Sequence, residues 1–110
     1  VENDAPTLAL DFAEVLDTSD LPGGVVNILT GYREELRGHV GGHRDVDAIL
    51  SVGASTEERT ILEREGAESV TRMEFRPDRS PAEWRSGESQ SPYWMTPFVE
   101  FKTTWHPVGR

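Results

Sequence analysis

The sequence predicts an α/β fold built around a parallel βαβαβ unit. Apolar residues recur at helical spacing near the amino terminus, and two short β-branched segments follow at residues 25–29 and 46–52. A helical pattern then separates the second segment from a third strand pattern at residues 70–75. Because parallel strands need a crossover between them, this alternation of strands and helices favours a small parallel sheet.

Length, charge and composition limit the classes of function. A chain of 110 residues is one small domain at most, since domains commonly take about 100 to 200 residues. The net charge of −9 repels phosphate backbones and anionic lipids, so we expect no nucleic-acid and no membrane partner. The absence of cysteine excludes disulfides, thiolate zinc sites and thiol catalysis on these residues. No apolar run is long enough to cross a bilayer, and a cytoplasmic location is expected.

The first predicted element is an amphipathic helix over residues 6–18. Leu8, Phe12 and Val15 recur at spacings of three and four, with acidic residues on the opposite side. Asp4 is the candidate amino-terminal cap of this helix. We therefore expect one apolar face to pack against the rest of the chain.

The second region combines a strand, a turn and a weaker helix. A Leu-Pro-Gly-Gly breaker precedes residues 25–29, which read as a buried parallel strand. Thr30 and Gly31 form the predicted tight turn into a helix over residues 34–42. Three glycines weaken that helix, because each one costs helix stability.

The third region repeats the same order. Residues 46–52 form the next predicted buried strand, which ends at Gly53. Ser55 reads as the amino-terminal cap of a helix over residues 56–68, followed by acidic first-turn residues that suit the helix dipole. Residues 70–75 complete the sheet as its third strand.

The remaining sequence divides into a linker and a tail. Residues 76–94 are rich in Pro, Ser, Gly and charge, and predict a surface linker, while residues 95–110 alternate in the manner of a strand. Aromatic residues dominate protein interfaces, although here they could equally cover the sheet of the same chain. These aromatic residues are Trp84, Tyr93, Trp94, Phe98, Phe101 and Trp105.

Several motifs resemble one enzyme family. Residues 6–10 read PTLAL and residues 21–31 read LPGGVVNILTG, similar to the aldehyde dehydrogenase patterns PLxAL and LPxGVVNVVxG. Residues 43–47 read HRDVD, like HxDVD, and residues 53–57 resemble GSTE with one inserted alanine. The segment up to residue 75 is thus identified as similar to the cofactor-binding part of an aldehyde dehydrogenase.

The resemblance extends to the two later strand patterns. Residues 70–75 loosely resemble the family's VTLELGG, and residues 100–105 read EFKTTW, similar to its carboxy-terminal ExKTVW. The resemblance implies a partial Rossmann-like unit over residues 1–75, a linker, and an oligomerisation-type strand over residues 95–110. It also implies a homo-oligomer or a partner chain bound through residues 98–105, from Phe98 to Trp105.

The family's catalytic chemistry is not expected from these residues alone. An aldehyde dehydrogenase needs a thiolate nucleophile and a carboxylate base, and in the family a whole catalytic domain would stand between Phe75 and Met95. Glu74 matches the position of the base, yet Arg76 and Pro77 replace the two glycines that follow it in the family. Glu74 is therefore expected to be a strand-edge glutamate, and no catalytic residue is predicted.

Binding of NAD or NADP is the more specific functional implication. The carboxyl ends of parallel strands and the amino ends of helices favour nucleotide phosphates. Arg33 and Arg59, however, replace two glycines of the family, and Glu57 with Glu58 bring negative charge to the same place. The candidate cofactor-binding residues are Thr30, Gly31, Gly53 and Ser55.

Other polar patterns carry weaker hypotheses. Glu35, His39 and His43 follow each other at four-residue spacing, which would align three metal ligands on one helical face. Glycine interruptions make that face unreliable, so a solvated helix face is favoured and no metal is expected. His106 has no neighbouring carboxylate in the sequence and is not expected to act as an acid or base.

Two functions follow from these observations. The first is an aldehyde-dehydrogenase-like segment with a scaffold or assembly role, which lacks its own catalytic cysteine. The alternative is the NAD(P)-binding part of an aldehyde oxidoreductase whose catalytic region is elsewhere, with contacts at Gly31 and Ser55. Neither is a complete aldehyde dehydrogenase on this chain alone.

Overall fold

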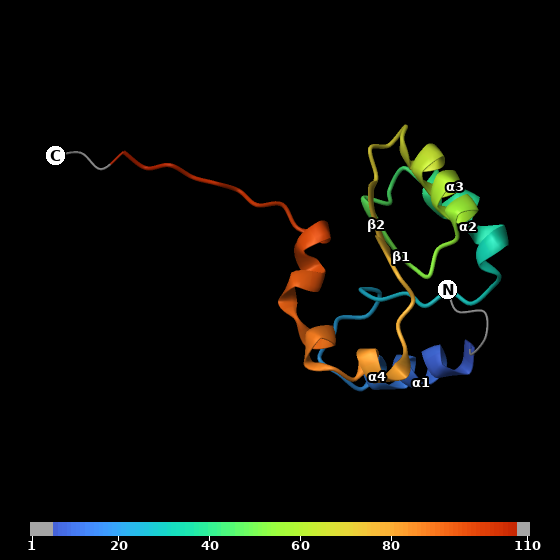
Figure 1. The fold of residues 1–110 in the computed structure, drawn as a ribbon. Helices are drawn as coiled ribbons and strands as arrows, with labels where there is room; N and C mark the ends of the chain where they lie inside the picture. The colour runs from blue at the N-terminus through green and yellow to red at the C-terminus, as the bar shows by residue number, and fades with distance from the viewer. Residues whose placement is uncertain (1–5, 108–110) are drawn as a thin grey trace.

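A computed structural model describes residues 6–107 of the chain (Figure 1). The predicted cap at Asp4 and the end of the predicted tail strand, residues 108–110, lie outside the described residues. The elements in chain order are the helices and strands α1 (Pro6–Asp17), α2 (Arg33–Gly41), β1 (Ala48–Val52), α3 (Thr56–Gly66), β2 (Arg72–Arg76) and α4 (Pro81–Trp84), followed by the 3₁₀ helices η1 (Gly87–Gln90) and η2 (Pro92–Phe98).

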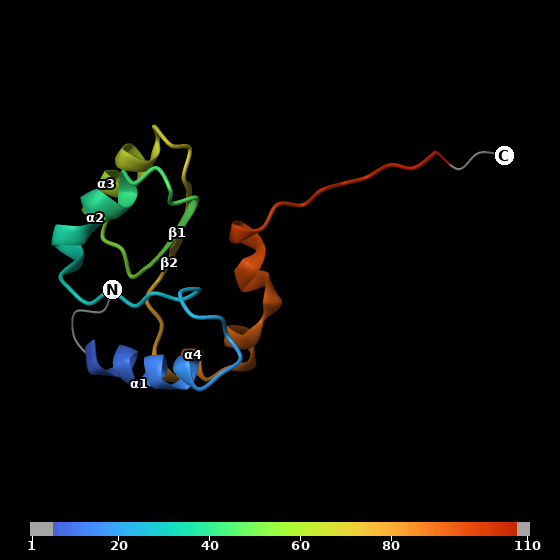
Figure 2. The same ribbon diagram turned by 180° about the vertical axis from the view of Figure 1, so that it is seen from behind.

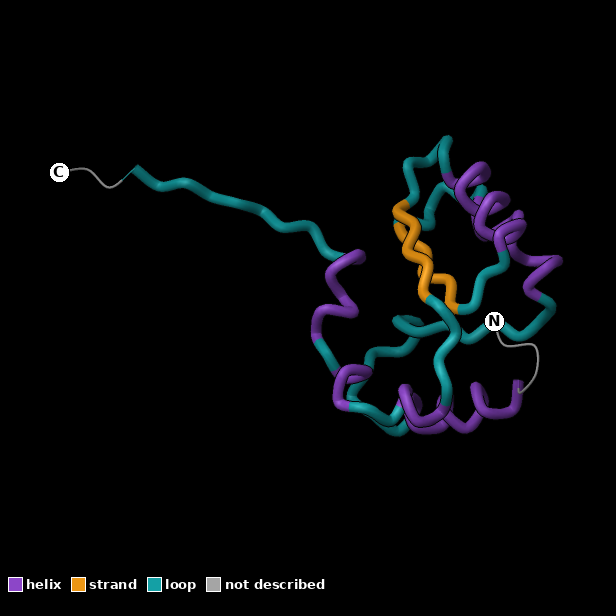
Figure 3. The backbone as a smooth tube through the Cα atoms, viewed as in Figure 1, coloured by secondary structure: helices purple, strands orange, loops and turns teal. Residues whose placement is uncertain are grey.

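The centre of the fold is a βαβ unit. Strands β1 and β2 pair in parallel, with Ala48 opposite Arg72 and Val52 opposite Arg76. Helix α3 makes the crossover between them, and α2 packs beside α3 on the same side of the sheet (Figures 1 and 3). This arrangement confirms the predicted α/β class. The described residues form a two-stranded sheet and not the larger predicted βαβαβ unit.

Local sequence explains why α3 begins where it does. The Ser55 hydroxyl accepts a hydrogen bond from the Glu58 backbone N–H at 3.1 Å, which satisfies one of the unpaired donors of the first turn. Acidic residues stand in the first turn and Arg64 in the last, as the helix dipole favours. The predicted cap and the predicted helix are confirmed.

The strand predicted over residues 25–29 is wrong. This segment has no regular structure, and its valines and leucine are exposed. The Asn27 side-chain amide donates to the carbonyl of Gly24 at 3.1 Å, a local turn contact rather than a sheet contact. A β-branched segment forms a strand only against a partner strand, and the described chain offers these residues none.

The tail also differs from its prediction. Residues 95–98 belong to η2, and residues 99–107 form no helix and no strand with the rest of the described chain. In Figures 1 and 2 this part runs away from the body of the molecule. The strand prediction is therefore wrong for residues 95–98, whereas pairing of the tail with a partner subunit stays a prediction.

The core of the fold is thin. Among residues 6–107, Leu62 on α3 is the buried large apolar side chain, with 3% of its surface exposed. Helix α1 forms as predicted, but Leu8, Phe12 and Val15 on its apolar face remain exposed. No helix in this range is apolar over a length that would cross a bilayer.

Candidate site at the carboxyl end of strand β1

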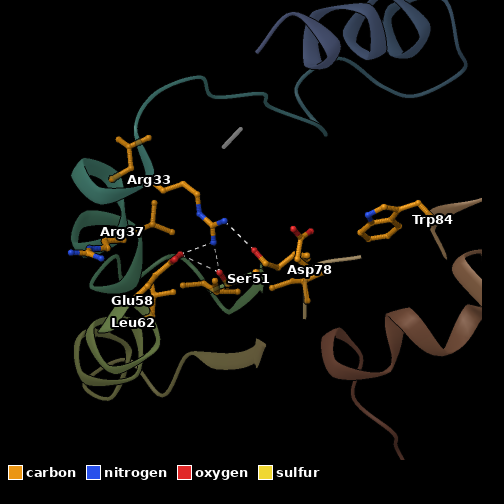
Figure 4. A pocket seen from close by; sticks show the side chains of 13 residues that line it. Arg33, Arg37, Ser51, Glu58, Leu62, Asp78 and Trp84 are labelled. Carbon is orange, nitrogen blue, oxygen red and sulfur yellow. Dashed lines mark hydrogen bonds and ion pairs between the residues drawn. The ribbon is translucent and has the colours of Figure 1, made fainter. Parts of the chain in front are cut away.

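A cavity of about 680 Å³ opens at the carboxyl end of β1. Its walls come from the strand itself and from the facing sides of α2 and α3, including Arg33 and Glu58. Asp78 and Trp84, which follow β2, lie across the opening from Arg33 (Figure 4). Parallel sheets commonly place their ligand sites at this edge, so the cavity is the candidate site of the chain.

Arg33, the first residue of α2, joins three elements at this edge. Its Nη1 donates to the Val52 carbonyl at 3.0 Å, and its Nη2 donates to the Ser51 hydroxyl at 2.7 Å. The same Nη2 lies 2.6 Å from Glu58 Oε1 on α3. One guanidinium therefore ties the start of α2 to the end of β1 and to the first turn of α3.

Ser51 is the polar residue inside this arrangement. It is 6% exposed, and its hydroxyl also lies 3.2 Å from Glu58 Oε1, to which it donates a hydrogen bond. The Glu58 side chain is 13% exposed, so its charge is largely withdrawn from water. Buried charges need such partners, and here Arg33 and Ser51 supply them.

A second ion pair lies beside the first. Arg37 Nη2 approaches Glu57 Oε1 at 2.9 Å, but the Glu57 side chain is mostly exposed. Exposed pairs of this kind contribute only about 0–1 kcal/mol, because water competes for both charges. Both ion pairs join α2 to α3, and the carboxylate is largely buried in the first pair but exposed in the second. The Arg37–Glu57 pair is therefore a suitable control for the Arg33–Glu58 pair.

The structure does not join the four predicted cofactor-binding residues into one site. Thr30 is exposed in the irregular segment before α2, and Gly31 lies close to Leu36, where an added Cβ would come 3.2 Å from Leu36 Cδ1. Gly53 lines the cavity, whereas Thr30, Gly31 and Ser55 do not.

Gly53 meets a definite backbone requirement. Its φ of 68° is in the left-handed region that side chains disfavour, and its N–H donates to the Arg76 carbonyl at 2.9 Å. An added Cβ would also lie 3.5 Å from Asp78 Cβ. Glycine at this position lets the chain leave β1 sharply and keeps the cavity edge close to β2.

Arginines and tryptophans position the far wall of the cavity. The Trp84 and Trp94 rings lie 5.8 Å apart, and the Arg79 guanidinium lies 5.6 Å and 5.3 Å from their respective centres. The Arg76 guanidinium lies 4.6 Å above the Trp94 ring. These cation–π contacts hold Trp84 beside the cavity and give the predicted linker, residues 76–94, a defined structure.

Sequence reasoning missed part of this site. Ser51 interrupts an otherwise apolar strand, Ile-Leu-Ser-Val, and that single polar residue was the available signal. Asp78 and Trp84 gave no local signal, because their place depends on how the chain turns after β2. Arg33 was identified only as a departure from the family pattern and Glu58 only as an acidic residue of the first helical turn, and the structure shows that they bind each other.

The remaining candidates lie outside the cavity. Glu74 Oε1 lies 2.6 Å from Arg76 Nε and is half-buried on β2. Helix α2 ends at Gly41, so His43 does not share a helical face with Glu35 and His39; its Nδ1 accepts from the Asp45 N–H instead. Within residues 6–107 no three acidic or histidine side chains are grouped to hold a metal ion.

Comparison with known proteins identifies the origin of these elements. The family model described as the aldehyde dehydrogenase family matches residues 1–75. Aldehyde dehydrogenase, cytosolic 1, of Mus musculus is 31% identical over 68 residues, which are 62% of this chain and 14% of that protein. NADP/NAD-dependent aldehyde dehydrogenase PuuC of Escherichia coli is 29% identical over 69 residues, 63% of this chain and 14% of that protein. No solved structure matches the chain.

The matches cover most of this chain but only a small part of each relative. The chain spans about 14% of the length of the curated relatives it matches. The matched residues include α1, α2, β1, α3 and nearly all of β2, and three of these elements, α2, β1 and α3, line the cavity. Because the family model covers well over half of the sequence, the chain belongs to the aldehyde dehydrogenase family.

Proposed function

We propose that this chain is a scaffold and assembly segment of the aldehyde dehydrogenase family, which acts by associating with a like or longer family chain. The observation that carries the proposal is the contrast between one buried large apolar side chain, Leu62, and many exposed ones within residues 6–107. A partial Rossmann-like unit is part of the proposal, supported by the parallel β1–α3–β2 crossover.

Eleven of the eighteen exposed large apolar residues lie in the matched segment. Eight of them lie on α1 and in the irregular region after it, where a longer family chain would supply a covering surface. Burying one such side chain contributes about 1.5–3 kcal/mol, so a covering partner would stabilise the segment strongly. The residues are Leu8, Leu10, Phe12, Val15, Leu21, Val25, Val26 and Leu29.

The tail supports association by a second route. Phe101 and Trp105 are 80% and 83% exposed on an extended backbone that has no ladder partner among the described residues. An extended segment with alternating apolar side chains suits addition to the edge of a neighbouring sheet. We therefore propose residues 98–105 as the strand that pairs with a partner subunit.

Binding of NAD or NADP is the competing proposal. It is supported by family membership and by a relative that is named as NADP/NAD-dependent. The contacts at the strand end favour the scaffold instead, because Arg33 and Glu58 line the cavity at the end of β1 and are already paired where a cofactor phosphate would need free donors. The residues present therefore do not fit a dinucleotide in this arrangement.

Molar mass in solution tests the assembly proposal. At high micromolar concentration we expect light scattering after size exclusion to show a dimer or larger species. Replacing Phe101 and Trp105 with serine should reduce the mass to that of a monomer, while the matched variant Thr103→Ser/Thr104→Ser should not. A monomeric wild-type chain at this concentration would contradict the proposal.

A further inference from the structure

We infer that Arg33 and Glu58 close the carboxyl end of β1 to a dinucleotide phosphate by occupying both halves of that site themselves. Arg33 provides the cation, and the Glu58 carboxylate stands where a ligand anion would need to lie. The inference deepens the proposed scaffold function, on which it rests, by giving a physical reason why this segment would not hold a nucleotide.

The contacts of Arg33 show how the end of β1 is occupied. The Arg33 guanidinium contacts the Val52 carbonyl at 3.0 Å and the Ser51 hydroxyl at 2.7 Å, so it lies across the last two residues of the strand. A glycine at residue 33 would leave this space open, because it has no side chain to place there. The long side chain of Arg33 occupies this space instead, and its guanidinium reaches the end of the strand.

The charged groups at this strand end are already paired with each other. Glu58 Oε1 receives hydrogen bonds from Arg33 at 2.6 Å and from Ser51 at 3.2 Å, and these donors are the groups that would otherwise serve an incoming phosphate. A phosphate would have to displace a carboxylate that is 13% exposed. Separating a partly buried ion pair is costly, because it leaves one charge without its partner.

Neighbouring groups reinforce the exclusion. Asp78 lies across the cavity, and Glu57 extends from the same first turn of α3 as Glu58. Arg37 is the other cation of the cavity wall and is paired with Glu57 at 2.9 Å. An anionic ligand at the end of β1 would therefore meet carboxylates, and arginines that are already paired with carboxylates (Figure 4).

Calorimetric titration with NAD tests the inference on matched double variants. Arg33→Ala/Glu58→Gln removes the closing pair, whereas Arg37→Ala/Glu57→Gln removes the exposed pair between the same helices with the same change in charge. We expect the first variant to bind NAD at least about tenfold more tightly than the wild type, and the control to bind as the wild type does. Equal affinity in wild type and a folded Arg33→Ala/Glu58→Gln variant would overturn the inference.

A second variant keeps the test decisive if the double variant does not fold. Glu58→Gln alone retains Arg33 and removes the internal anion, so binding of inorganic pyrophosphate should increase by about tenfold. No increase in a Glu58→Gln variant with native circular dichroism would count against closure. Molar mass, measured on the same samples, reports separately on the scaffold proposal, so the two ideas can fail independently.

Discussion

At the residue scale, the Arg33, Ser51 and Glu58 contacts make a polar centre inside a very small apolar core. Ser51 is nearly as buried as Leu62, yet it lies between a guanidinium and a carboxylate. Such a centre holds the helices in register with the strand only while every member is paired. The stability of the βαβ unit should therefore depend on Ser51 as well as on apolar packing.

Replacing Ser51 with alanine tests this dependence. The change removes the acceptor of an Arg33 hydrogen bond and the donor to Glu58, so we expect the free energy of unfolding to fall by about 1–3 kcal/mol. Urea denaturation followed by circular dichroism measures the change. The control Thr104→Ala, on the exposed tail, should stay within about 0.5 kcal/mol of wild type, and an equal effect of both substitutions would refute the prediction.

Glu83 provides a residue-scale prediction about pH. Hydrogen bonds from the Ser80 hydroxyl and the Ser80 backbone N–H, at 2.6 Å and 2.7 Å, hold the pKa of Glu83 below its ordinary value, and the Arg79 charge adds to the effect. Because the folded pKa is lowered, the cap of α4 is stabilised above the ordinary pKa and loses this contribution as pH falls through the lowered one.

Carboxyl chemical shifts in an NMR titration measure this pKa directly. In the Ser80→Ala variant the hydroxyl is lost, so we expect the Glu83 pKa to rise toward that of an unstructured glutamate. A Glu83 pKa that does not move would show that the Ser80 hydroxyl is not its main cause.

At the element scale, α2 and α3 pack closely because glycine lies at their contact. Gly41, the last residue of α2, is buried, and an added Cβ would stand 3.2 Å from Glu65 Cβ and 3.3 Å from Leu62 Cδ2. Gly38, one turn earlier, has nothing within 4 Å of the same position. The sequence pattern counted both glycines as costs to the helix, but the structure gives Gly41 a packing role.

The two glycines predict opposite effects on stability. Gly41→Val should lower the melting temperature, because overpacking at a tight helix contact costs about 1–3 kcal/mol. Gly38→Ala should raise it, since alanine in an open helix position stabilises by about 0.5–1 kcal/mol. Thermal melts by circular dichroism compare them, and a destabilising Gly38→Ala would contradict the open environment of that residue.

At the scale of the whole molecule, the chain is not compact. Its radius of gyration is 17.4 Å and its extents are 63 × 36 × 31 Å, whereas a compact domain of this length has a radius of about 13 Å. The extended tail and the separate position of α1 account for the difference (Figure 2). A chain with this shape has a large apolar surface available for association.

Removing residues 99–110 separates stability from assembly. Residues 99–107 make no strand with the rest of the described chain, so the deletion should leave the melting temperature of the βαβ unit within about 2 °C of wild type at dilute concentration. The same deletion should abolish the concentration dependence of the molar mass. A large loss of melting temperature in the dilute, monomeric protein would show that the tail packs on its own chain.

Much of the fold was predictable because its signals are local. The spacing of apolar residues located α1, and the cap at Ser55 located α3. A short β-branched run located β1, and the alternating pattern at residues 70–75 located β2. The same kind of signal failed at residues 25–29 and 95–98, which form no strand among the described residues. A sequence with high strand propensity forms a strand in a sheet only when a neighbouring strand is available to pair with it.

The sequence by itself therefore determined the family, the helices α1, α2 and α3, and the two paired strands of this chain. Only the tertiary structure decided which strand patterns find partners and which charged residues meet. Arg33 and Glu58 are 25 positions apart, and Arg33 and Ser51 are 18 apart, so no local pattern reports their contact. The β1–α3–β2 crossover brings them to one strand end, where burial makes their pairing necessary.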